Sequence, residues 1–560
     1  MGANVVLFYY LQIKLRIIYV FLQRKFTVTM IITELQQLYA AHPNVEGMCR
    51  LLKNNSVRHL YCSGLCASAA SLFSSVLVQR AECPFVFILG DLEEAGYFYH
   101  DLTQILGAER VLFFPSSFRR AIKYGQKDAA NEILRTEVLS RLQKGEEGLC
   151  VVTSPDALAE KVVSRKELGD KTLKLHTGEK VDMDFVTEVL RSYGFEYVDY
   201  VYEPGQYAVR GSIIDVFSFS SECPFRIDFF GDEVESIRTF EVESQLSKEK
   251  KEDIVIVPDL SRSLEQGGNG GMVSFLDFLR PDTLLAMRDF LWLRERIQAV
   301  HDESLTAAAI AAREAEENGA ISLEGKLIDG GEFTLRALDF RRMEFGTKPT
   351  GTPDATVSFS TAAQPIFHKN FDLVAESFQD YLARNYTLYI CSDSLKQTDR
   401  IRAIFEDRGD NISFTPVERT LHEGFADDTL RLCIFTDHQL FDRFHKYNLK
   451  SDKARSGKVA LSLKELNQFT PGDYVVHTDH GVGRFTGLVR IPNGDTTQEV
   501  MRLVYQNDDV VFVSIHSLHK VSKYKGKEGE APRLNKLGTG AWEKLKDRTK
   551  TKIKDIARDL

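Results

Sequence analysis

Residues 63–70, SGLCASAA, are the first stretch whose residue types and spacing could do chemistry. They follow a short apolar run, which is where an α/β nucleotide-binding protein places its phosphate loop. Such a loop, G-x-x-x-x-G-K-[ST], needs a second glycine so that the backbone can approach the phosphates, and a lysine to pair with them. Residues 63–70 have neither, and the pattern occurs nowhere else in the chain. We therefore expect an ATPase-like fold without ATPase chemistry, and we assign no catalytic residue and no cofactor to this chain.

His477, Asp479 and His480 form a second candidate, because an H-x-D-H run carries nitrogen and oxygen donors that can bind metals. On an extended strand, His477 and Asp479 share one face, whereas His480 points away. No third ligand follows at the spacing of zinc sites. We expect structural hydrogen bonds near a tight turn here, and no metal.

Two arginines and an aromatic residue form a third candidate. Arg226, Asp228 and Phe230 would share one face of an extended strand. Together with Arg210 they could offer a partner charge-assisted hydrogen bonds around an apolar anchor. The alternative is that both arginines pair with Asp215 or Asp228 inside the sheet and that Phe230 is a core residue. The residues alone favour this alternative.

The elements around residues 63–70 predict an α/β domain at residues 30–156. Four short apolar runs alternate with helical stretches, and this order predicts a parallel sheet covered on both faces, with strands at residues 59–61, 85–89, 111–114 and 149–153. We expect an amphipathic helix, MIITELQQLYAAHP, to begin at Met30. Residues 247–360 resume this mixed character, with an alanine-rich helix at residues 305–318.

A further small α/β domain is predicted at residues 361–449, with strands at residues 388–391 and 432–436. A charged stretch of small residues follows it and predicts a linker at residues 450–465.

Two segments change to a period near two, which is typical of strands. Residues 157–246 are β-rich, with Arg210-Gly211 opening one strand and Gly231-Asp232 following its return strand, so we expect a meander inserted into the α/β domain. Residues 466–526 contain PGDYVVHTDHGVGRFTGL, which predicts a hairpin that turns at Gly481-Val482-Gly483.

Two further strands are expected in the second segment, at residues 500–505 and 510–515. The whole segment then describes a compact, strongly bent sheet or small barrel that is built to dock on a partner.

The two ends of the chain differ in character. Residues 7–22 are apolar but are interrupted by Lys14 and Arg16, so we interpret residues 1–29 as an extension from a misplaced start site; a peripheral membrane helix and a signal sequence are the alternatives. Residues 527–560 are a basic linker and the start of a helix, which we expect to continue into another domain. Lysines of this helix could touch DNA, but interleaved acidic residues favour a linker helix.

Composition bounds the class of protein. A formal net charge of −9 argues against a chain that coats nucleic acid along its length. Residues 516–560 nevertheless contain 13 Lys or Arg against 6 Asp or Glu, so a nearby acidic partner or DNA is possible there. The 8 cysteines are scattered without a C-x-x-C pair and indicate reduced residues of a cytoplasmic protein.

Two sequence patterns resemble a known family. The pattern RG-x-[IL][IL]D-[VL]F followed by R-[IL]-[DE]-FF-x-DE-[IV]-[DE]-S-[IL]-R resembles the UvrA-binding meander that UvrB shares with the transcription-repair coupling factors. Residues 471–523 resemble the RNA polymerase-interacting domain of the same factors and of CarD-type regulators. UvrB lacks the second pattern and CarD lacks the first. A chain with both patterns in this order is similar to the coupling factors. The helix that leads into their DNA translocase is resembled by the closing stretch LGTGAWEKLKDRTKTKIKDIARDL.

The resemblance implies a multi-domain α/β fold. Its parts would be a degenerate helicase-like UvrB module at residues 30–156 and 247–360, an inserted UvrA-binding domain, a small α/β domain, a CarD/Tudor-like small barrel and a C-terminal linker helix. The resemblance also implies that the chain stops before the translocase motor. That motor would then bind ATP and Mg²⁺ and make most contacts with double-stranded DNA, and this chain would catalyse no reaction.

The resemblance further implies partners and contact residues. Arg210, Arg226 and Phe230 match the family positions for UvrA. The contact edge for the RNA polymerase β subunit is expected where the strand leaves the hairpin, at Leu488, Val489, Arg490 and Ile491, and Ile491 matches an apolar family contact position. For Ile491 an ordinary core position is the alternative. The implied function is a non-catalytic cytoplasmic adaptor that binds stalled RNA polymerase and recruits UvrA, with no membrane partner. A motorless CarD-like regulator is the alternative, and an active UvrB-like helicase is disfavoured by the missing lysine near Ala69.

Overall fold

The computed structural model describes most of the chain, and the described residues are 29–81, 83–117, 129–242, 245–258, 260, 272–314, 325–445, 447, 470–493, 496–514, 521–524, 532–537, 542, 546 and 548. The apolar run at residues 7–22, the linker at residues 450–465 and most of the basic segment at residues 527–560 lie outside them. The chain divides into two units, Met1–Asp170 with Leu260–Ser451 and Lys171–Asp259 with Asp452–Leu560. Each is described by itself.

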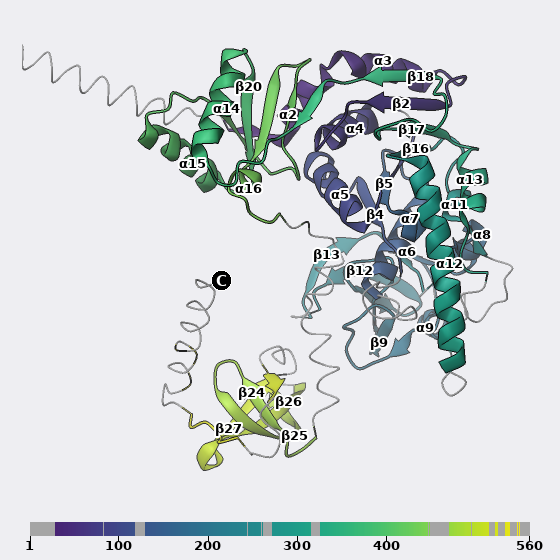
Figure 1. Cartoon of the computed structure of the whole chain (residues 1–560). Coiled ribbons are helices and arrows are strands. Elements are labelled where there is room, and N and C mark those ends of the chain that lie inside the picture. The colour runs from purple at the N-terminus through teal and green to yellow at the C-terminus, as the bar shows by residue number, and fades with distance from the viewer. Residues whose placement is uncertain are drawn as a thin grey trace, which may run out of the picture. The chain divides into compact units, whose positions relative to one another are not determined.

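A parallel sheet of seven strands forms the first part of unit 1 (Figure 1). Its order is β18-β2-β17-β16-β3-β5-β4, and all its pairs are parallel. The strands are β2 His59–Ser63, β3 Phe85–Ile88, β4 Val111–Phe114, β5 Cys150–Thr153, β16 Leu284–Met287, β17 Arg341–Glu344 and β18 Ala355–Ser358. The four apolar runs expected before residue 156 are β2 to β5, so the predicted parallel sheet is confirmed.

Helices cover this sheet, and they are α4 Ala69–Arg80, α5 Leu92–Leu106, α6 Ala129–Lys144, α12 Phe290–Glu314 and α13 Gly330–Ala337. Helix α4 is buried from Ala69 to Val78 because its residues are small or apolar on every side. The alanine-rich helix expected at residues 305–318 is the second half of α12, which begins earlier, at Phe290; residues 315–318 lie outside the described part. Short elements complete this region: α7 Pro155–Leu158, α8 Arg165–Asp170, α11 Phe275–Phe278 and the pair β6 Val162–Val163 with β15 Met272–Val273.

The prediction of one helix that begins at Met30 is wrong in two respects. Met30 and Ile31 form a strand, β1 Met30–Ile31, and the helix α2 Ile32–Ala40 follows it. A second helix, α3 Pro43–Lys53, then begins at Pro43. Proline has no N–H to donate and is favoured in the first turn of a helix, so it starts α3 instead of continuing α2. The ring of His42 caps the new helix, since its Nδ1 accepts the Asn44 N–H at 3.1 Å.

A mixed sheet of six strands forms the second part of unit 1, in the order β1-β21-β20-β23-β22-β19. Its other strands are β19 Thr361–Ala363, β20 Thr387–Ser392, β21 Thr415–Glu418, β22 Phe425–Asp427 and β23 Leu432–Thr436, and its helices are α14 Phe371–Ala383, α15 Leu395–Arg408 and α16 Asp437–Leu440. The strands expected at residues 388–391 and 432–436 are β20 and β23. Both sheets share one core, which joins Phe73 of α4 to Cys391 of β20 and Val417 of β21.

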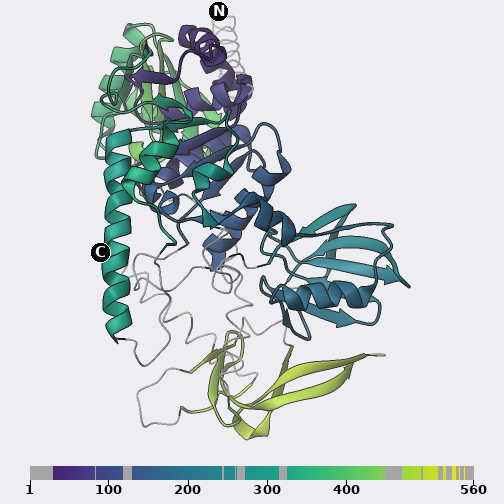
Figure 2. The same ribbon diagram turned by 90° about the vertical axis from the view of Figure 1, so that its right-hand side faces the viewer.

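An antiparallel meander forms the first sheet of unit 2, in the order β13-β12-β11-β10-β9-β8, where only β8 and β9 run parallel. The strands are β8 Glu196–Tyr197, β9 Gln206–Arg210, β10 Ile213–Val216, β11 Phe225–Phe230, β12 Glu233–Phe240 and β13 Ser247–Lys251. A separate antiparallel pair is formed by β7 Leu173–His176, which precedes the meander in the sequence, and β14 Asp253–Ile256, which follows it. Helix α9, Met183–Ser192, packs on one face of the sheet through Val186 and Leu190 (Figure 2).

The meander differs from the expected one at two points. Arg210 is the last residue of β9, and Gly211, with φ +61°, lies in the turn before β10, so the pair Arg210-Gly211 ends one strand instead of opening the next. Strand β13 lies beyond residue 246, where we expected the β-rich segment to end. Its sequence, SKEKK, is exposed at every position, and such a charged edge strand has no apolar alternation for a sequence pattern to detect.

A five-stranded antiparallel sheet forms the second sheet of unit 2, in the order β27-β26-β25-β24-β28. The strands are β24 Tyr474–His477, β25 Gly481–Asn493, β26 Thr496–Val504, β27 Val510–Ser514 and β28 Val521–Lys523, with a 3-10 turn at Gln506–Asp508. The hairpin is confirmed, but its turn is residues 478–480 and not Gly481-Val482-Gly483. Both glycines lie in β25, and Gly483 leaves room for the Tyr505 ring, which a Cβ there would approach to 2.9 Å.

The coarse prediction of a mixed α/β chain with parallel and antiparallel sheets is therefore confirmed. All eight cysteines are free. Within the described ranges, no helix combines the length and the apolar character needed to cross a membrane.

Candidate partner-binding surfaces

The meander of unit 2 has one apolar face and one charged face, because its strands alternate. Tyr207, Ile214, Ile227 and Val234 point to the side of α9 and form the core. Residues opposite one another in an antiparallel sheet share a face, and Ala208, Asp215, Arg226 and Arg238 stand in one such row. The second face therefore carries the charged residues of the sequence patterns described above, together with a small buried apolar cluster of Val201, Ala208, Phe217 and Phe240.

Asp215 holds both candidate arginines on this charged face. Arg226 donates to it through two nitrogens, Nε to Oδ1 at 2.7 Å and Nη2 to Oδ2 at 2.9 Å, and Arg210 donates through Nη2 to Oδ2. The Asp215 side chain is 1% exposed, that of Arg226 14% and that of Arg210 37%. The hydrogen bond to Asp215 raises the pKa of Arg226 above its usual value. Two positive charges thus share one buried negative charge, and Arg210 is the more accessible of the two.

Aromatic rings and a carbonyl fix the planes of the two guanidinium groups. Arg226 lies over the Phe240 ring at 4.5 Å and donates through Nη1 to the Gln245 carbonyl oxygen at 3.1 Å. Arg210 lies over the Tyr200 ring at 5.1 Å. These contacts lower the entropy that each side chain would lose on binding, so both arginines are preorganised.

Phe230 projects from the same face and is not a core residue. It is 79% exposed at the end of β11, whereas the neighbouring Phe229 is 4% exposed. Gly231, with φ +63°, makes the turn that follows. The alternative formulated from sequence is therefore half right: both arginines pair with Asp215 inside the sheet, but the aromatic side chain is offered to solvent.

A second ion pair lies next to this cluster, and sequence reasoning did not single out its cation. Arg238 donates to Asp228 at 3.0 Å, and both side chains are partly exposed, at 32% and 24%. Tyr200, which supports Arg210, was also missed. The alternation of β12 could have placed Arg238 opposite Arg226, but Tyr200 lies outside every strand and no pattern points to it.

The candidate polymerase-binding residues lie on a two-stranded ribbon. Strand β24 pairs with β25 only at residues 481–484, and β27 pairs with β26 only at residues 500–504, but β25 and β26 stay paired out to Asn493 and Thr496 (Figure 2). Leu488 is 41% exposed and Val489 is half-buried. Arg490 and Ile491 continue β25, and their side chains lie outside the described part. An extended ribbon of this kind offers backbone groups for pairing with a partner strand.

Phe512 is a further exposed aromatic side chain of this sheet that sequence reasoning missed. It is 50% exposed on the outer strand β27, opposite Arg502. Its strand was predicted, but periodicity alone does not tell which face of an isolated five-residue strand is solvated.

The H-x-D-H run forms the turn between β24 and β25. His477 is 4% exposed, and its Nδ1 accepts the Asp479 N–H at 3.1 Å, which is the structural hydrogen bond expected there. Asn535 and Trp542 pack against the same turn, since the Val482 N–H donates to Asn535 Oδ1 and the Trp542 Nε1–H donates to the Thr478 oxygen, both at 2.8 Å. Gly481 makes room for them, because a Cβ there would lie 2.7 Å from Asn535. Lys546, a candidate DNA contact, donates to the Thr478 oxygen at 3.0 Å.

In unit 1, residues of the chain itself fill the phosphate-type loop before α4. The Cys66 N–H donates to Thr361 Oγ1 at 3.1 Å, and the Thr361 hydroxyl donates to the Gly64 oxygen at 2.6 Å. A Cβ at Gly64 would lie 2.1 Å from the Phe359 oxygen. Phe359, in the connection between β18 and β19, and Thr361, the first residue of β19, therefore occupy the loop.

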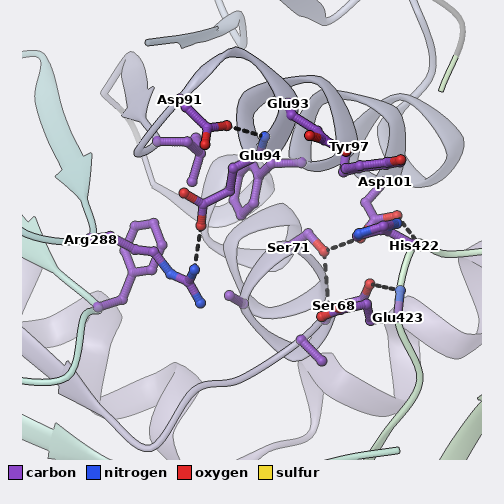
Figure 3. Close-up of a pocket in the computed structure, with 15 residues that line it drawn as sticks. Ser68, Ser71, Asp91, Glu93, Glu94, Tyr97, Asp101, Arg288, His422 and Glu423 are labelled. Atoms are coloured by element: carbon purple, nitrogen blue, oxygen red, sulfur yellow. Dashed lines mark hydrogen bonds and ion pairs between the residues drawn. The ribbon is translucent and has the colours of Figure 1, made fainter. Parts of the chain in front are cut away.

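A cavity of about 320 Å³ lies beside this loop, at the carboxyl ends of the parallel strands (Figure 3). Ligands of open α/β sheets bind at this edge. Here the lining is acidic, with one arginine, Arg288, that pairs with Glu94; the other acidic side chains are Asp91, Glu93, Asp101 and Glu423. Such a lining repels a triphosphate.

Four histidines pack together at the junction of the two sheets of unit 1. The His422 ring stacks on Tyr97 at 3.5 Å, the His438 ring stacks on His445 at 4.3 Å, and His100 meets His445 edge to face at 5.0 Å. Burial lowers the pKa of His100 and His438 to about 4 and that of His422 to about 3. No group of His, Cys, Asp and Glu in the described residues is arranged to hold a metal ion.

Comparisons with known proteins match both sheets of unit 2. The model of the UvrB interaction domain matches residues 173–261, and the model of the CarD-like/TRCF RID domain matches residues 469–525. The transcription-repair-coupling factor of Bacillus subtilis (strain 168) is 24% identical over 569 residues, which cover 89% of this chain and 48% of that protein. The protein of the same name from Staphylococcus aureus (strain bovine RF122 / ET3-1) is 25% identical over 578 residues, with the same coverage.

The chain thus spans about half the length of the curated relatives it matches. Its charged meander lies within the first matched domain, and its ribbon of β25 and β26 lies within the second. The resemblance seen in the sequence is confirmed: this chain is similar over 89% of its length to the transcription-repair-coupling factors, and it contains matches to the UvrB interaction domain and to the CarD-like/TRCF RID domain.

Proposed function

We propose that this chain is a non-catalytic adaptor that binds stalled RNA polymerase with one domain and recruits UvrA with another, and so couples transcription to nucleotide excision repair. Its homology to the coupling factors and the order of its two matched domains support this role. The observation that carries the proposal is the exposure of Phe230, 79%, beside two preorganised arginines on one sheet face.

UvrA would bind to the charged face of the meander. Arg210 keeps accessible N–H donors, so it can take a carboxylate of the partner, and Phe230 can enter an apolar pocket. Arg226 is less exposed, and its contact with UvrA would be made through the edge that Asp215 leaves accessible. Large exposed aromatic side chains next to arginine are frequent binding hot spots, whereas an isolated monomer gains nothing by exposing them.

The RNA polymerase β subunit would bind to the ribbon of β25 and β26. Residues 488–491 lie on the part of β25 whose described pairing is with β26 alone, so a polymerase strand can add to its free side. The half-exposed Leu488 would then supply an apolar contact.

Binding of the purified chain to UvrA and, separately, to the RNA polymerase β subunit tests the proposal by calorimetry. We expect both to bind. Binding to neither partner would overturn the adaptor function. Binding to polymerase alone would favour the second candidate function, a CarD-like regulator without a repair role. The separate match of residues 469–525 to the CarD-like domain supports this candidate.

We assign no cofactor to the residues of this chain, and its place of action would be the cytoplasm. The filled loop before α4 and the acidic cavity beside it support the absence of nucleotide chemistry here. ATP, Mg²⁺ and most contacts with double-stranded DNA would belong to a translocase part of the full-length factors. Hydrolysis of ATP by the purified chain would contradict this assignment.

A further inference from the structure

Arg210 is the accessible arginine of the charged face, but hydrogen bonds alone do not fix its orientation. Arg226 is held by two hydrogen bonds to Asp215 and by a third to the Gln245 carbonyl oxygen. Among the described residues, Arg210 makes one hydrogen bond, through Nη2 to Asp215. A long side chain that is 37% exposed and held at one atom keeps rotamer freedom, which it would lose when a partner binds it. A second contact is therefore needed to orient Arg210 before binding.

Tyr200, in the connection between β8 and β9, provides this second contact. The guanidinium carbon of Arg210 lies over the Tyr200 ring, 5.1 Å from its centre. The face of an aromatic ring attracts a guanidinium group, and the attraction becomes stronger when a partner excludes water from the pair. Tyr200 is 38% exposed, so the ring and the guanidinium group lie together at the surface. The ring and Asp215 thus restrict the directions in which the remaining N–H donors of Arg210 point.

The backbone on both sides of Tyr200 is anchored, and this gives the ring a fixed position. Before it, the Val198 N–H donates to a carbonyl oxygen of β9 at 2.9 Å. After it, Val201 is fully buried in the small apolar cluster of the charged face. The side-chain oxygen of Gln206 accepts the next two backbone N–H groups, at 2.9 and 3.0 Å. Gln206 begins β9 and Arg210 ends it, so one strand carries both the support of the ring and the guanidinium group.

We propose that Tyr200 is a positioning residue for the binding of UvrA. Its ring holds the guanidinium group of Arg210 in the orientation that receives a carboxylate of the partner. This inference rests on the proposed function. It adds to the contact surface a residue that lies outside both sequence patterns and acts through Arg210.

Calorimetric titration of variants of the whole chain with UvrA tests this proposal. Tyr200→Leu keeps an apolar side chain but removes the ring, and we expect the Kd for UvrA to rise about fivefold. Tyr200→Phe keeps the ring and should change the Kd by less than about twofold. Both variants should melt within about 2 °C of the parent chain, because substitutions of exposed residues change stability little.

A double-mutant cycle separates positioning from direct contact. In an Arg210→Ala chain, no guanidinium group remains to be oriented, so Tyr200→Leu should change the Kd by less than about twofold. Tyr197→Leu is the matched control. Tyr197 is 57% exposed in the same meander, but its ring meets that of Tyr207 on the side of α9, and its substitution should leave the Kd unchanged.

Four results, each obtained with a parent chain that binds UvrA, would overturn the proposal and leave the proposed function intact. The first is an unchanged Kd in Tyr200→Leu. The second is an equal loss in Tyr200→Phe, which would indicate that the hydroxyl group acts. The third is an equal loss with and without Arg210, which would indicate that Tyr200 itself touches UvrA. The fourth is an equal loss in Tyr197→Leu. If the parent chain does not bind UvrA, the proposed function fails and this inference fails with it.

Discussion

Asp215 and Asp101 are both buried carboxylates, but they organise their surroundings in opposite ways. Asp215 holds two arginines, of which Arg210 keeps donors that face solvent, on the same sheet face as the exposed Phe230. Asp101 holds a hydroxyl and a backbone N–H, and it lies at the wall of the acidic cavity of unit 1. The same chemical group therefore positions arginines at a surface of the meander and joins α4, α5 and the connection between β21 and β22 inside unit 1. The difference lies in the partners, since Arg210 is partly exposed and keeps further donors, whereas Ser71 is buried and its one hydroxyl proton is used.

Lowering the pH should give the largest difference in stability between unit 1 and the meander of unit 2. The pKa values of His100, His422 and His438 are lowered from 6.5 to about 4, 3 and 4, so the folded state of unit 1 keeps these rings neutral. The unfolded chain binds these protons near pH 6.5. The free energy of unfolding of unit 1 is therefore at its full value above pH 6.5. It falls as the pH is lowered toward 4, by on the order of 3 kcal/mol for each histidine. The raised pKa of Asp101 changes the stability of unit 1 in the opposite direction, but Asp101 is one group and the histidines are three.

Trp292 in unit 1 and Trp542 in unit 2 are the only tryptophans, so fluorescence in a Trp542→Phe background measures this effect on unit 1 as a function of pH. His438→Asn should reduce the acid sensitivity, because one buried ring that must remain neutral is removed. A Trp292 transition that does not change between pH 7 and pH 4.5 would contradict the account of the histidine cluster.

Asp215→Ala should be the most damaging single change in the meander. It leaves Arg226, whose side chain is 14% exposed, without its buried partner, and breaking a buried pair costs about 3 kcal/mol. Hydrogen exchange of the β10 and β11 amides measures the loss. The matched control is Asp228→Ala, which breaks the more exposed pair with Arg238 and should cost less than about 1 kcal/mol. Equal effects of the two substitutions would show that Asp215 has no special role.

Phe230→Ala should weaken UvrA binding without weakening the fold. The side chain is 79% exposed, so the free energy of unfolding should change by less than about 0.5 kcal/mol. As a hot spot it should cost about 2 kcal/mol of binding, roughly 30-fold in Kd. Phe185→Ala is the control, because Phe185 is 52% exposed on α9. A loss of affinity in the control but not in Phe230→Ala would move the UvrA surface to the other side of the sheet.

Leu488→Asp should have the smallest of these effects. It places a charge on the half-exposed edge of the ribbon, and we expect about tenfold weaker binding to the RNA polymerase β subunit. Phe512→Asp, on the outer strand β27, is the control and should leave the affinity nearly unchanged. The reverse order of the two effects would place the polymerase on β27.

Sequence patterns predicted what local chemistry determines. Apolar runs of three to five residues predicted β2 to β5 and the two central strands of the second sheet, because strands of a parallel sheet that is covered on both faces are mostly apolar. Alternation placed Arg226, Asp228 and Phe230 on one face. The strand β1 could not be predicted, since Met30 and Ile31 pair with Val417 and Glu418, which lie far away in the sequence.

The candidate sites show the same limit. The missing lysine of residues 63–70 is visible in the sequence, but the threonine that fills the loop, Thr361, comes from a strand almost 300 residues away. Likewise the sequence offered Asp215 as a partner for the arginines, yet the exposure of Phe230 follows from the position of the turn at Gly231 and from what the fold leaves uncovered. Contacts between distant segments decided these points, and a pattern in one segment does not contain them.

The central claim is that this chain joins two partners, and a bridging experiment tests it directly. UvrA is immobilised, the RNA polymerase β subunit is added, and its retention is measured with and without the purified chain. The account predicts that the β subunit is retained only when the chain is present, and that Phe230→Ala and Leu488→Asp each reduce retention. Binding of each partner alone but never of both together would contradict the account.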